Sequence, residues 1–181
     1  KINALYLTFW GANIHSKTVK RILNIIKKTK INAIIVDVKN EYGYTSYKTS
    51  FDQANSYGAA KEKTIGNMKN FMRVMKENNV YLIARIAVFK DEIQAVNNED
   101  YAIKKRDGTI WRNHDDMAWV DPFDERSHTY TIAIAEDAAK MGFDEINFDY
   151  IRFPARSGLK LLKKNNQKNR VAAIEQFLKS A

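Results

Sequence analysis

Short apolar runs rich in isoleucine and valine alternate along this chain with longer segments in which apolar residues recur every three or four positions. The short runs predict β-strands, and the longer segments predict α-helices with one buried stripe. The predicted strands cover residues 4–9, 33–38, 81–89 and 145–149. Strands and helices that alternate in this way are typical of βα units that build a parallel sheet. The sequence therefore predicts an α/β protein with four βα units.

The predicted helices carry recognisable start and stop signals. The first begins near Ser16, a residue type that often caps helices, and the last is entered near Asn169. Gly142 suits the end of the third helix, because glycine readily adopts the left-handed backbone that follows many helices. The apolar stripes are Val19, Ile22, Leu23 and Ile26; Met68, Phe71, Met72 and Met75; Tyr130, Ala133, Ile134, Ala138 and Met141; and Val171, Ile174, Phe177 and Leu178.

Polar residues gather at the ends of the predicted strands. In parallel α/β folds, binding and catalytic residues lie on the loops that follow the strands, and three of the four units have long loops there. Side chains alternate between the two faces of a strand, so Asp37, Arg85, Asn147 and Asp149 all lie on the face opposite the apolar one. We expect Asp37, Arg85 and Asp149 to converge near the carboxyl ends of the strands.

Position alone leaves two interpretations of these residues open. An aspartate and an arginine on neighbouring strands can form a catalytic pair or a purely structural ion pair. Breaking a buried ion pair often costs about 3–5 kcal/mol, so such pairs are retained without any catalytic role.

Composition narrows the classes of protein. With 181 residues, 45% of them apolar, and two prolines, the chain is long enough for one domain with a hydrophobic core. It has no apolar run of membrane-spanning length and no signal-peptide features at its start. The absence of cysteine excludes disulfides and cysteine-ligated metals. The net charge of +9 is compatible with polyanionic partners, although the lysines are scattered along helix faces.

Four motifs follow one another over nearly the whole chain: VDVKNEYGYTSY at 36–47, ARIAVFKD at 84–91, WVDP at 119–122 and GFDEINFDYIRFP at 142–154. Together they resemble the "putative glycoside hydrolase" domain family, formerly described as a domain of unknown function. Its members are similar to TIM-barrel glycosidases of the α-amylase-like kind. The resemblance implies a (β/α)8 barrel, of which residues 1–181 would form a single partial-barrel domain of about four βα units.

The resemblance also implies glycosidase-like activity on a polysaccharide or glycan. In similar barrels the aspartate that ends strand four is the nucleophile or stabilises an oxocarbenium-like transition state, and the motif puts Asp149 in that position. Arg85 is expected to orient it. A second carboxyl group is needed about 5 Å away in a retaining enzyme, or about 6.5–9.5 Å away in an inverting one. In related barrels it comes from a later strand, so we expect further chain or a second copy to complete the barrel, unless catalysis has been lost.

Further residues near the strand ends are candidates for substrate binding. The candidates are Asp37, Lys39, Glu41, Trp10, Tyr42, Arg152 and Asn147. A cation beside a carboxylate keeps it ionised, and Arg152 could do this for Asp149. Because Arg152 has the opposite strand parity to Asp149, it reaches that site only if the strand ends near Tyr150; otherwise it only pins the loop. Lys39, in the pattern D-x-K-x-E, could act in Schiff-base or proton-transfer chemistry, but binding at the rim is the favoured role.

Five aromatic residues lie on or beside the post-strand loops, where aromatic faces can stack on sugar rings. They are Trp10, Tyr42, Tyr44, Trp111 and Trp119. Trp10 and Tyr42 are favoured as ligand contacts, because they follow strands directly.

The remaining expectations concern partners and location. The acidic segment 112–125 lacks EF-hand spacing, so neither a metal nor a cofactor is predicted. The runner-up function is a non-catalytic glycan- or polyanion-binding module on a half-barrel scaffold. Nucleic acid is not a predicted partner, because there is no reading motif and no continuous basic stripe. The family resemblance favours an extracytoplasmic or cell-envelope location. An open partial barrel would leave Ile35, Ile83 and Ala87 uncovered, which favours a homo-oligomer or a further segment that covers them.

Overall fold

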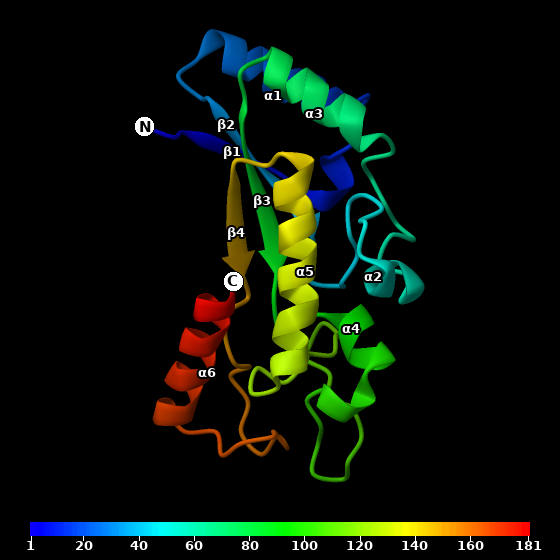
Figure 1. Cartoon of the computed structure of the whole chain (residues 1–181), viewed down its shortest axis with the longest axis vertical. Helices are drawn as coiled ribbons and strands as arrows, with labels where there is room; N and C mark the ends of the chain where they lie inside the picture. Colours follow the sequence, from blue (N-terminus) through cyan, green and yellow to red (C-terminus); the bar gives the residue numbers. More distant parts are fainter. The chain divides into compact units, whose positions relative to one another are not determined.

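The computed structural model describes residues 1–181 (Figure 1). The chain divides into two compact units. The first unit comprises residues 1–40, 44–86 and 134–147. The second comprises residues 41–43, 87–133 and 148–181. Both units are therefore built from segments that are far apart in the sequence.

All four predicted strands are present, and they form one parallel sheet. The strands are β1 (Ala4–Leu7), β2 (Ala33–Lys39), β3 (Tyr81–Ala87) and β4 (Glu145–Asp149). Hydrogen-bonded neighbours follow the order β1-β2-β3-β4. In the register of the sheet, Ala33 is paired with Ala4 on one side and with Tyr81 on the other. The prediction of an α/β fold with a four-stranded parallel sheet is confirmed.

Two strands are shorter than predicted. Strand β1 ends at Leu7 because the chain then enters a 3-10 turn, η1 (Phe9–Gly11), in which the Gly11 N–H donates to the Thr8 carbonyl at 2.9 Å. Strand β3 ends at Ala87, two residues before the predicted end.

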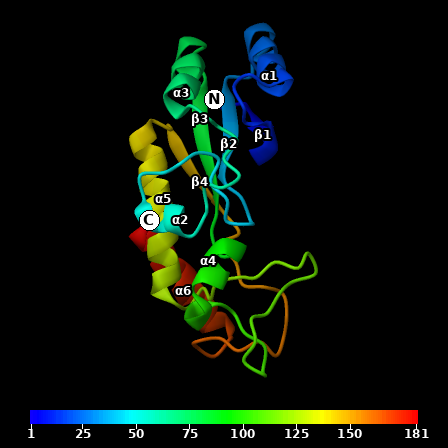
Figure 2. The same ribbon diagram turned by 90° about the vertical axis from the view of Figure 1, so that its right-hand side faces the viewer.

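Figure 2 shows the helices of the first unit, and α1 and α3 bury residues of their predicted stripes. They are α1 (Lys17–Lys28), the short α2 (Asp52–Ser56) and α3 (Met68–Glu77). Ser16 caps α1 as predicted, because its Oγ accepts a hydrogen bond from the Val19 N–H at 3.1 Å. Phe71, Met72 and Met75 are buried on α3, so the spacing of the apolar residues predicted the correct face.

The two faces of the sheet differ in chemistry. Ile34, Val36 and Val38 of β2 are completely buried, as the predicted helix-packing face requires. On the opposite face, Tyr6 is 47% exposed. Ile83 and Ala87 also lie on that face, yet both are buried, so the expectation that they would be uncovered is wrong. The chain itself therefore covers part of this face.

The second unit contains most of the insertion after β3 and the segment after β4. Its helices are α4 (Glu92–Asn97), the 3-10 turn η2 (Glu99–Tyr101) and α6 (Gln167–Ser180), while α5 (Glu125–Met141) begins in the second unit and ends in the first. Single antiparallel bridges such as Lys104 to Ile110 fold the insertion onto itself, and the bridge from Lys104 to Lys160 joins it to the segment after β4. They form a small scaffold that the strand pattern did not predict.

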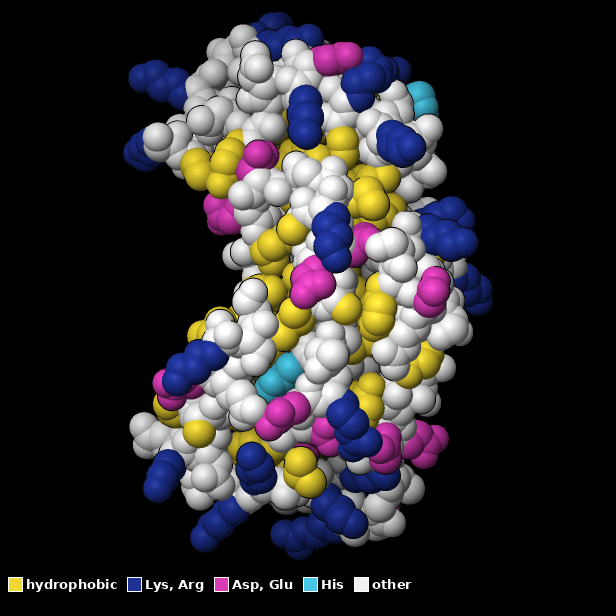
Figure 3. All heavy atoms as spheres, in the orientation of Figure 1, with side chains coloured by type: hydrophobic (Ala, Val, Ile, Leu, Met, Phe, Trp, Pro, Cys, Tyr) yellow, Lys and Arg dark blue, Asp and Glu magenta, His cyan; other side chains and the backbone are white.

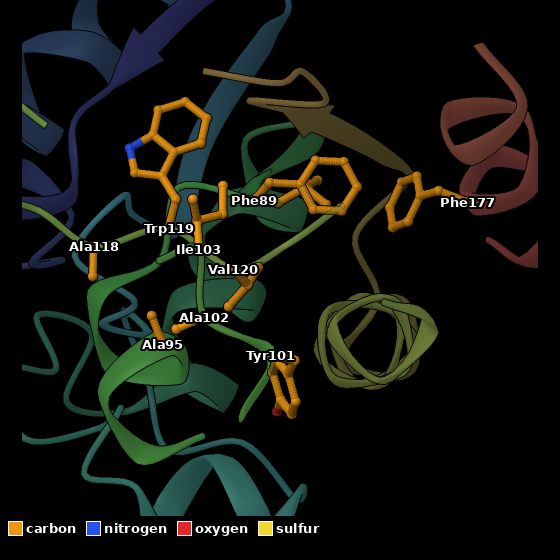
Figure 4. Close-up of a cluster of buried hydrophobic side chains, with 10 residues drawn as sticks. Phe89, Ala95, Tyr101, Ala102, Ile103, Ala118, Trp119, Val120 and Phe177 are labelled. Carbon is orange, nitrogen blue, oxygen red and sulfur yellow. The ribbon is translucent and has the colours of Figure 1, made fainter. Parts of the chain in front are cut away.

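An aromatic and aliphatic cluster forms the core of the second unit (Figure 4). The ring of Phe177 on α6 contacts the ring of Phe89 with centroids 5.7 Å apart, and that of Phe148 at 5.1 Å. Phe177 is completely buried, whereas Val171 and Leu178 of the same predicted stripe are 59% and 55% exposed. The stripe predicted for α6 is therefore only partly correct, because the helix packs through a narrower face.

His128 on α5 lies in this core, and its burial should make the stability of the protein depend on pH. The ring is 3% exposed, contacts the rings of Phe89 and Phe177, and has Nε2 at 2.9 Å from the Pro122 carbonyl. Burial lowers the pKa of His128 from its ordinary value of 6.5. Below pH 6.5 the unfolded chain takes up a proton that the folded chain resists, so stability should fall as the pH drops from 6.5 toward the lower folded pKa.

Urea unfolding at pH 7.5 and pH 5.5 checks this prediction. A single proton limits the slope to about 1.4 kcal/mol per pH unit. His128→Gln should weaken the pH dependence, while His15→Gln, at an exposed position, should leave it unchanged. An unaltered pH dependence in the His128 variant would contradict the assignment.

Surface properties add two observations. Lysine and arginine side chains are dispersed over the face shown in Figure 3 and form no continuous stripe there. None of the helices combines the length and the apolar character that a membrane span requires.

Candidate functional site

A buried ion pair lies on the polar face of the sheet in the first unit. Arg85 Nη1 on β3 is 2.6 Å from Asp37 Oδ1 on β2, and the two side chains are 11% and 7% exposed. The hydroxyl of Tyr6 on β1 donates to Asp37 Oδ2 at 3.0 Å. The Arg85 guanidinium also lies over the Tyr6 ring, 5.8 Å from its centroid. Three adjacent strands thus contribute to one polar cluster, as the alternation of side chains predicted for Asp37 and Arg85.

The residues that follow Asp37 are less accessible than expected. Lys39 is completely buried at the end of β2, although the sequence favoured a role at the rim. The physical reason is an irregularity in the β2–β3 register between Asp37 and Lys39, which shifts the alternation of faces. Glu41 is half-buried, and Asn147 on β4 is exposed.

The backbone turns sharply directly after Asp149. Asp149 is the last residue of β4, and its side chain is exposed. Its Oδ1 accepts a hydrogen bond from the Tyr150 N–H at 2.7 Å, and its carbonyl accepts one from the Val88 N–H at 2.8 Å. Tyr150 has a φ of 55°. A bulky residue rarely adopts this left-handed conformation, and strain of this kind is common at functional sites.

Two cations lie over the ring of Tyr150. Lys90 Nζ is 5.3 Å from the centroid of its ring, and the Arg152 guanidinium carbon is 5.4 Å from it. Arg152 also lies over the Trp119 ring at 5.5 Å, and the Trp119 and Tyr150 rings meet edge to face at 6.0 Å. Arg152 is therefore stacked on aromatic faces in the second unit. Its predicted role beside Asp149 stays a prediction, as does the expected convergence of Asp149 with Asp37 and Arg85.

Lys90 also organises the acidic loop that the sequence flagged. Its Nζ is 3.0 Å from Asp115 Oδ2, and the Lys90 ammonium lowers the pKa of Asp115 below its ordinary value of 3.8. Burial raises the pKa of Asp121, although its carboxylate accepts hydrogen bonds from the N–H groups of Phe123 and Leu162 at 2.9 and 2.6 Å. Asp121 therefore attaches the segment after β4 to the insertion after β3. The His, Asp and Glu residues form no group that could hold a metal ion.

The aromatic residues nearest the strand ends are exposed. Trp10 is 63% exposed and contacts the Phe9 ring edge to face at 5.1 Å. Tyr42 is 45% exposed, and its carbonyl accepts a hydrogen bond from the Ile93 N–H at 3.1 Å. Both are accessible to a ligand, as their predicted role requires.

A cavity of about 750 Å³ opens in the second unit, between the insertion after β3 and the segment after β4. Its lining is Lys105, Trp111, Arg112, Asn113, His114, Trp119, Arg152, Pro154, Ala155, Arg156, Ser157, Gly158 and Leu159. The size is within the usual range for small-molecule sites. Apart from Arg152 and the loop aromatics Trp111 and Trp119, none of these residues was considered for the site from the sequence. The available signal was the presence of Trp111 and Trp119 among the loop aromatics.

Comparisons with known proteins agree with this fold. A crystal structure of a hypothetical protein from Ruminiclostridium thermocellum ATCC 27405 matches with 32% sequence identity and a TM-score of 0.87, over 97% of this chain and 90% of that one. A search of curated proteins found no significant match.

Two glycosidases share the fold at lower identity. Alpha-L-fucosidase isoenzyme 2 from Paenibacillus thiaminolyticus is 13% identical with a TM-score of 0.62, over 98% of this chain and 29% of that enzyme. The cycloalternan-degrading enzyme from Trueperella pyogenes is 10% identical with a TM-score of 0.60, over 98% and 30%. The chain thus spans less than a third of the length of these enzymes.

The family model described as "Putative glycosyl hydrolase domain" matches residues 4–181, which is nearly the whole chain. The match contains the motifs on which the predicted resemblance was based. This chain therefore belongs to the "Putative glycosyl hydrolase domain" family.

Proposed function

We propose that this chain is a glycoside hydrolase-like domain that acts on a polysaccharide or glycan, and that its four βα units form part of a (β/α)8 barrel. Membership of the family and the fold shared with the two glycosidases support the proposal. The strand order β1-β2-β3-β4 is the order in which successive βα units follow one another around such a barrel.

The observation that carries the proposal is Asp149 at the carboxyl end of β4. An exposed carboxylate at this end of a parallel sheet is where catalytic residues of α/β barrels lie. The left-handed Tyr150 ends the strand immediately after it, so the carboxylate stands at the edge of the sheet. In this proposal Asp149 is the nucleophile or the group that stabilises positive charge on the sugar ring in the transition state.

The polar cluster of the first unit has a supporting role in this proposal. The Asp37–Arg85 ion pair places two charged side chains in fixed positions on the polar face of the sheet, because each partner is held by the other and by Tyr6. Arg85 would position Asp149, and Asp37 would contribute to substrate binding. Trp10 and Tyr42 offer exposed aromatic surface for sugar rings.

A hydrolysis assay tests the proposal. The natural polypeptide that contains these residues is incubated with a panel of plant, bacterial and storage polysaccharides, and new reducing ends are measured over time. We expect at least one polysaccharide to be cleaved. The anomeric configuration of the product then shows whether the enzyme retains or inverts, and hence how far apart its two catalytic carboxyl groups lie. If polysaccharides bind but none is cleaved, a non-catalytic binding module is the better description and the hydrolase proposal is wrong.

A further inference from the structure

The cavity in the second unit has a strongly one-sided charge. Four of its lining residues are always or normally cationic, namely Lys105, Arg112, Arg152 and Arg156, and the lining contains neither aspartate nor glutamate. Arg112 is neutralised by Glu92, since Arg112 Nη2 lies 2.6 Å from Glu92 Oε1. None of the ion pairs of the chain involves Arg152 or Arg156, whereas Lys105 interacts electrostatically with the nearby Asp107 carboxylate. Two positive charges in this cavity, those of Arg152 and Arg156, are therefore available to an anion.

Arg152 is held in a geometry that suits anion binding. Its guanidinium carbon lies over the rings of Trp119 and Tyr150, at 5.5 and 5.4 Å from their centroids. Stacking occupies the faces of a guanidinium and leaves its N–H groups, which lie in the plane, able to donate. A guanidinium fixed in this way can bind a carboxylate or a sulfate through two parallel hydrogen bonds.

The aromatic part of the lining is suited to a sugar ring. Trp111 is half-buried, and its ring centroid lies 6.4 Å from that of Trp119 at an interplanar angle of 50°. The Trp119 side chain is only 3% exposed, and its indole N–H is a buried donor without an acceptor. Buried donors of this kind are uncommon in folded proteins, and a water or ligand oxygen usually satisfies them.

Backbone pairing gives the cavity a defined wall. The Lys160 N–H donates to the Lys104 carbonyl at 2.8 Å, and the Lys104 N–H donates back to the Lys160 carbonyl at 3.3 Å. The Trp111 N–H donates to the Ile103 carbonyl at 2.8 Å. The two segments that line the cavity are thus connected through their main chains, which fixes the backbone on which the tryptophans and arginines of the lining are placed.

We propose that this cavity binds an acidic sugar residue of a glycan, one that carries a carboxylate or a sulfate ester. The anionic group is bound by Arg152 and Arg156 with help from Lys105, and the sugar ring packs against Trp111 beside Trp119. The inference rests on the proposed function and deepens it, because it assigns a charged class of glycan to the domain. A neutral glycan would leave Arg152 and Arg156 without an anionic partner in the bound state.

Binding of defined oligosaccharides to the natural polypeptide tests the proposal. Titration calorimetry at physiological salt compares an oligogalacturonate (carboxylate), a sulfated chondroitin oligosaccharide (sulfate), and neutral cello- and malto-oligosaccharides of the same length. We expect an acidic probe to bind at least about ten-fold more tightly than the neutral ones, because hydrogen bonds to charged groups typically contribute this much. The preferred acidic probe then identifies the source of the charge.

Matched variants separate the cavity from general charge attraction. Arg156→Gln removes an exposed arginine without an ion-pair partner, and we expect about ten-fold weaker binding of the acidic probe. Arg21→Gln removes the same charge from an exposed position on α1 and should change affinity less than about two-fold. Trp111→Ala should weaken binding of the same probe by a similar factor through loss of stacking.

Three results would overturn the inference: equal binding of acidic and neutral probes, equal losses in the Arg156 and Arg21 variants, or equal binding of a single-stranded RNA of the same charge. These outcomes are independent of hydrolysis. Cleavage of a neutral polysaccharide with no preference for acidic probes would leave the proposed function intact and remove this inference. Selective binding of acidic sugars without cleavage of any glycan would support this inference and contradict the proposed hydrolase function.

Discussion

Replacing Asp149 by asparagine is expected to lower the rate of glycan hydrolysis by at least about 1,000-fold, because an amide can neither form the covalent intermediate nor stabilise an oxocarbenium-like charge. The fold should tolerate the change. Asp149 is exposed, and the Oδ1 of asparagine can still accept the hydrogen bond from the Tyr150 N–H. The measurement is the initial rate on a polysaccharide that the unchanged protein cleaves, together with a thermal melt.

Asp144→Asn provides the matched control. Asp144 precedes β4 at the other end of the strand, is exposed, and accepts the Leu82 N–H through Oδ2 at 2.8 Å, which an asparagine oxygen can also do. This variant should retain activity within about two-fold, since it is remote from the carboxyl end of the sheet. If Asp149→Asn retains more than a few per cent of the activity with an unchanged melting temperature, Asp149 is not the nucleophile.

Replacing Gly43 by alanine is expected to destabilise the protein by about 3–5 kcal/mol, through backbone strain combined with a steric clash. Gly43 has a φ of 90°, which an alanine tolerates poorly. An added Cβ would lie 2.1 Å from Asp91 Oδ1 and 2.8 Å from Ile93 Cβ. Asp91 cannot move away freely, because the same Oδ1 caps α4 by accepting the Gln94 N–H at 2.8 Å.

Gly58→Ala isolates the contribution of the backbone. Gly58 has a φ of 82°, but an added Cβ there would meet no atom within 4 Å. It should therefore cost only the conformational penalty of about 1–2 kcal/mol. For a chain of this size, chemical denaturation and thermal melts should show a lowering of Tm by roughly 10 °C for Gly43→Ala and about 3–6 °C for Gly58→Ala. Equal losses in the two variants would show that Asp91 yields without cost and would contradict the steric part.

Much of the fold could be predicted because its signals are local. The stripe Met68, Phe71, Met72 and Met75 predicted α3, and the Ser16 cap predicted the start of α1. The pairing of Asp37 with Arg85 could also be predicted, because strict alternation puts both side chains on one face of adjacent strands. Such patterns depend only on helix and strand periodicity, which is the same in every protein.

The candidate site was less predictable, for identifiable reasons. Strict alternation would place Lys39 on the same face as Asp37, yet an irregularity in the β2–β3 register leaves Lys39 completely buried. Val171 and Leu178 matched the helical period of α6, but the period does not indicate how wide a face the neighbouring core covers. The left-handed backbone at Tyr150 has no signature in the sequence, since tyrosine seldom adopts it.

By itself, the sequence determined the α/β class, the four strands of a parallel sheet, the family and the position of Asp149 at the end of the fourth strand. Only the tertiary structure decided that Trp111 and Trp119 line a basic cavity, because that cavity depends on main-chain pairing between Lys104 and Lys160, which are 56 positions apart. The physical reason is the range of the interactions. Periodicity and capping act within a few residues, whereas contacts between distant loops depend on how the chain packs as a whole.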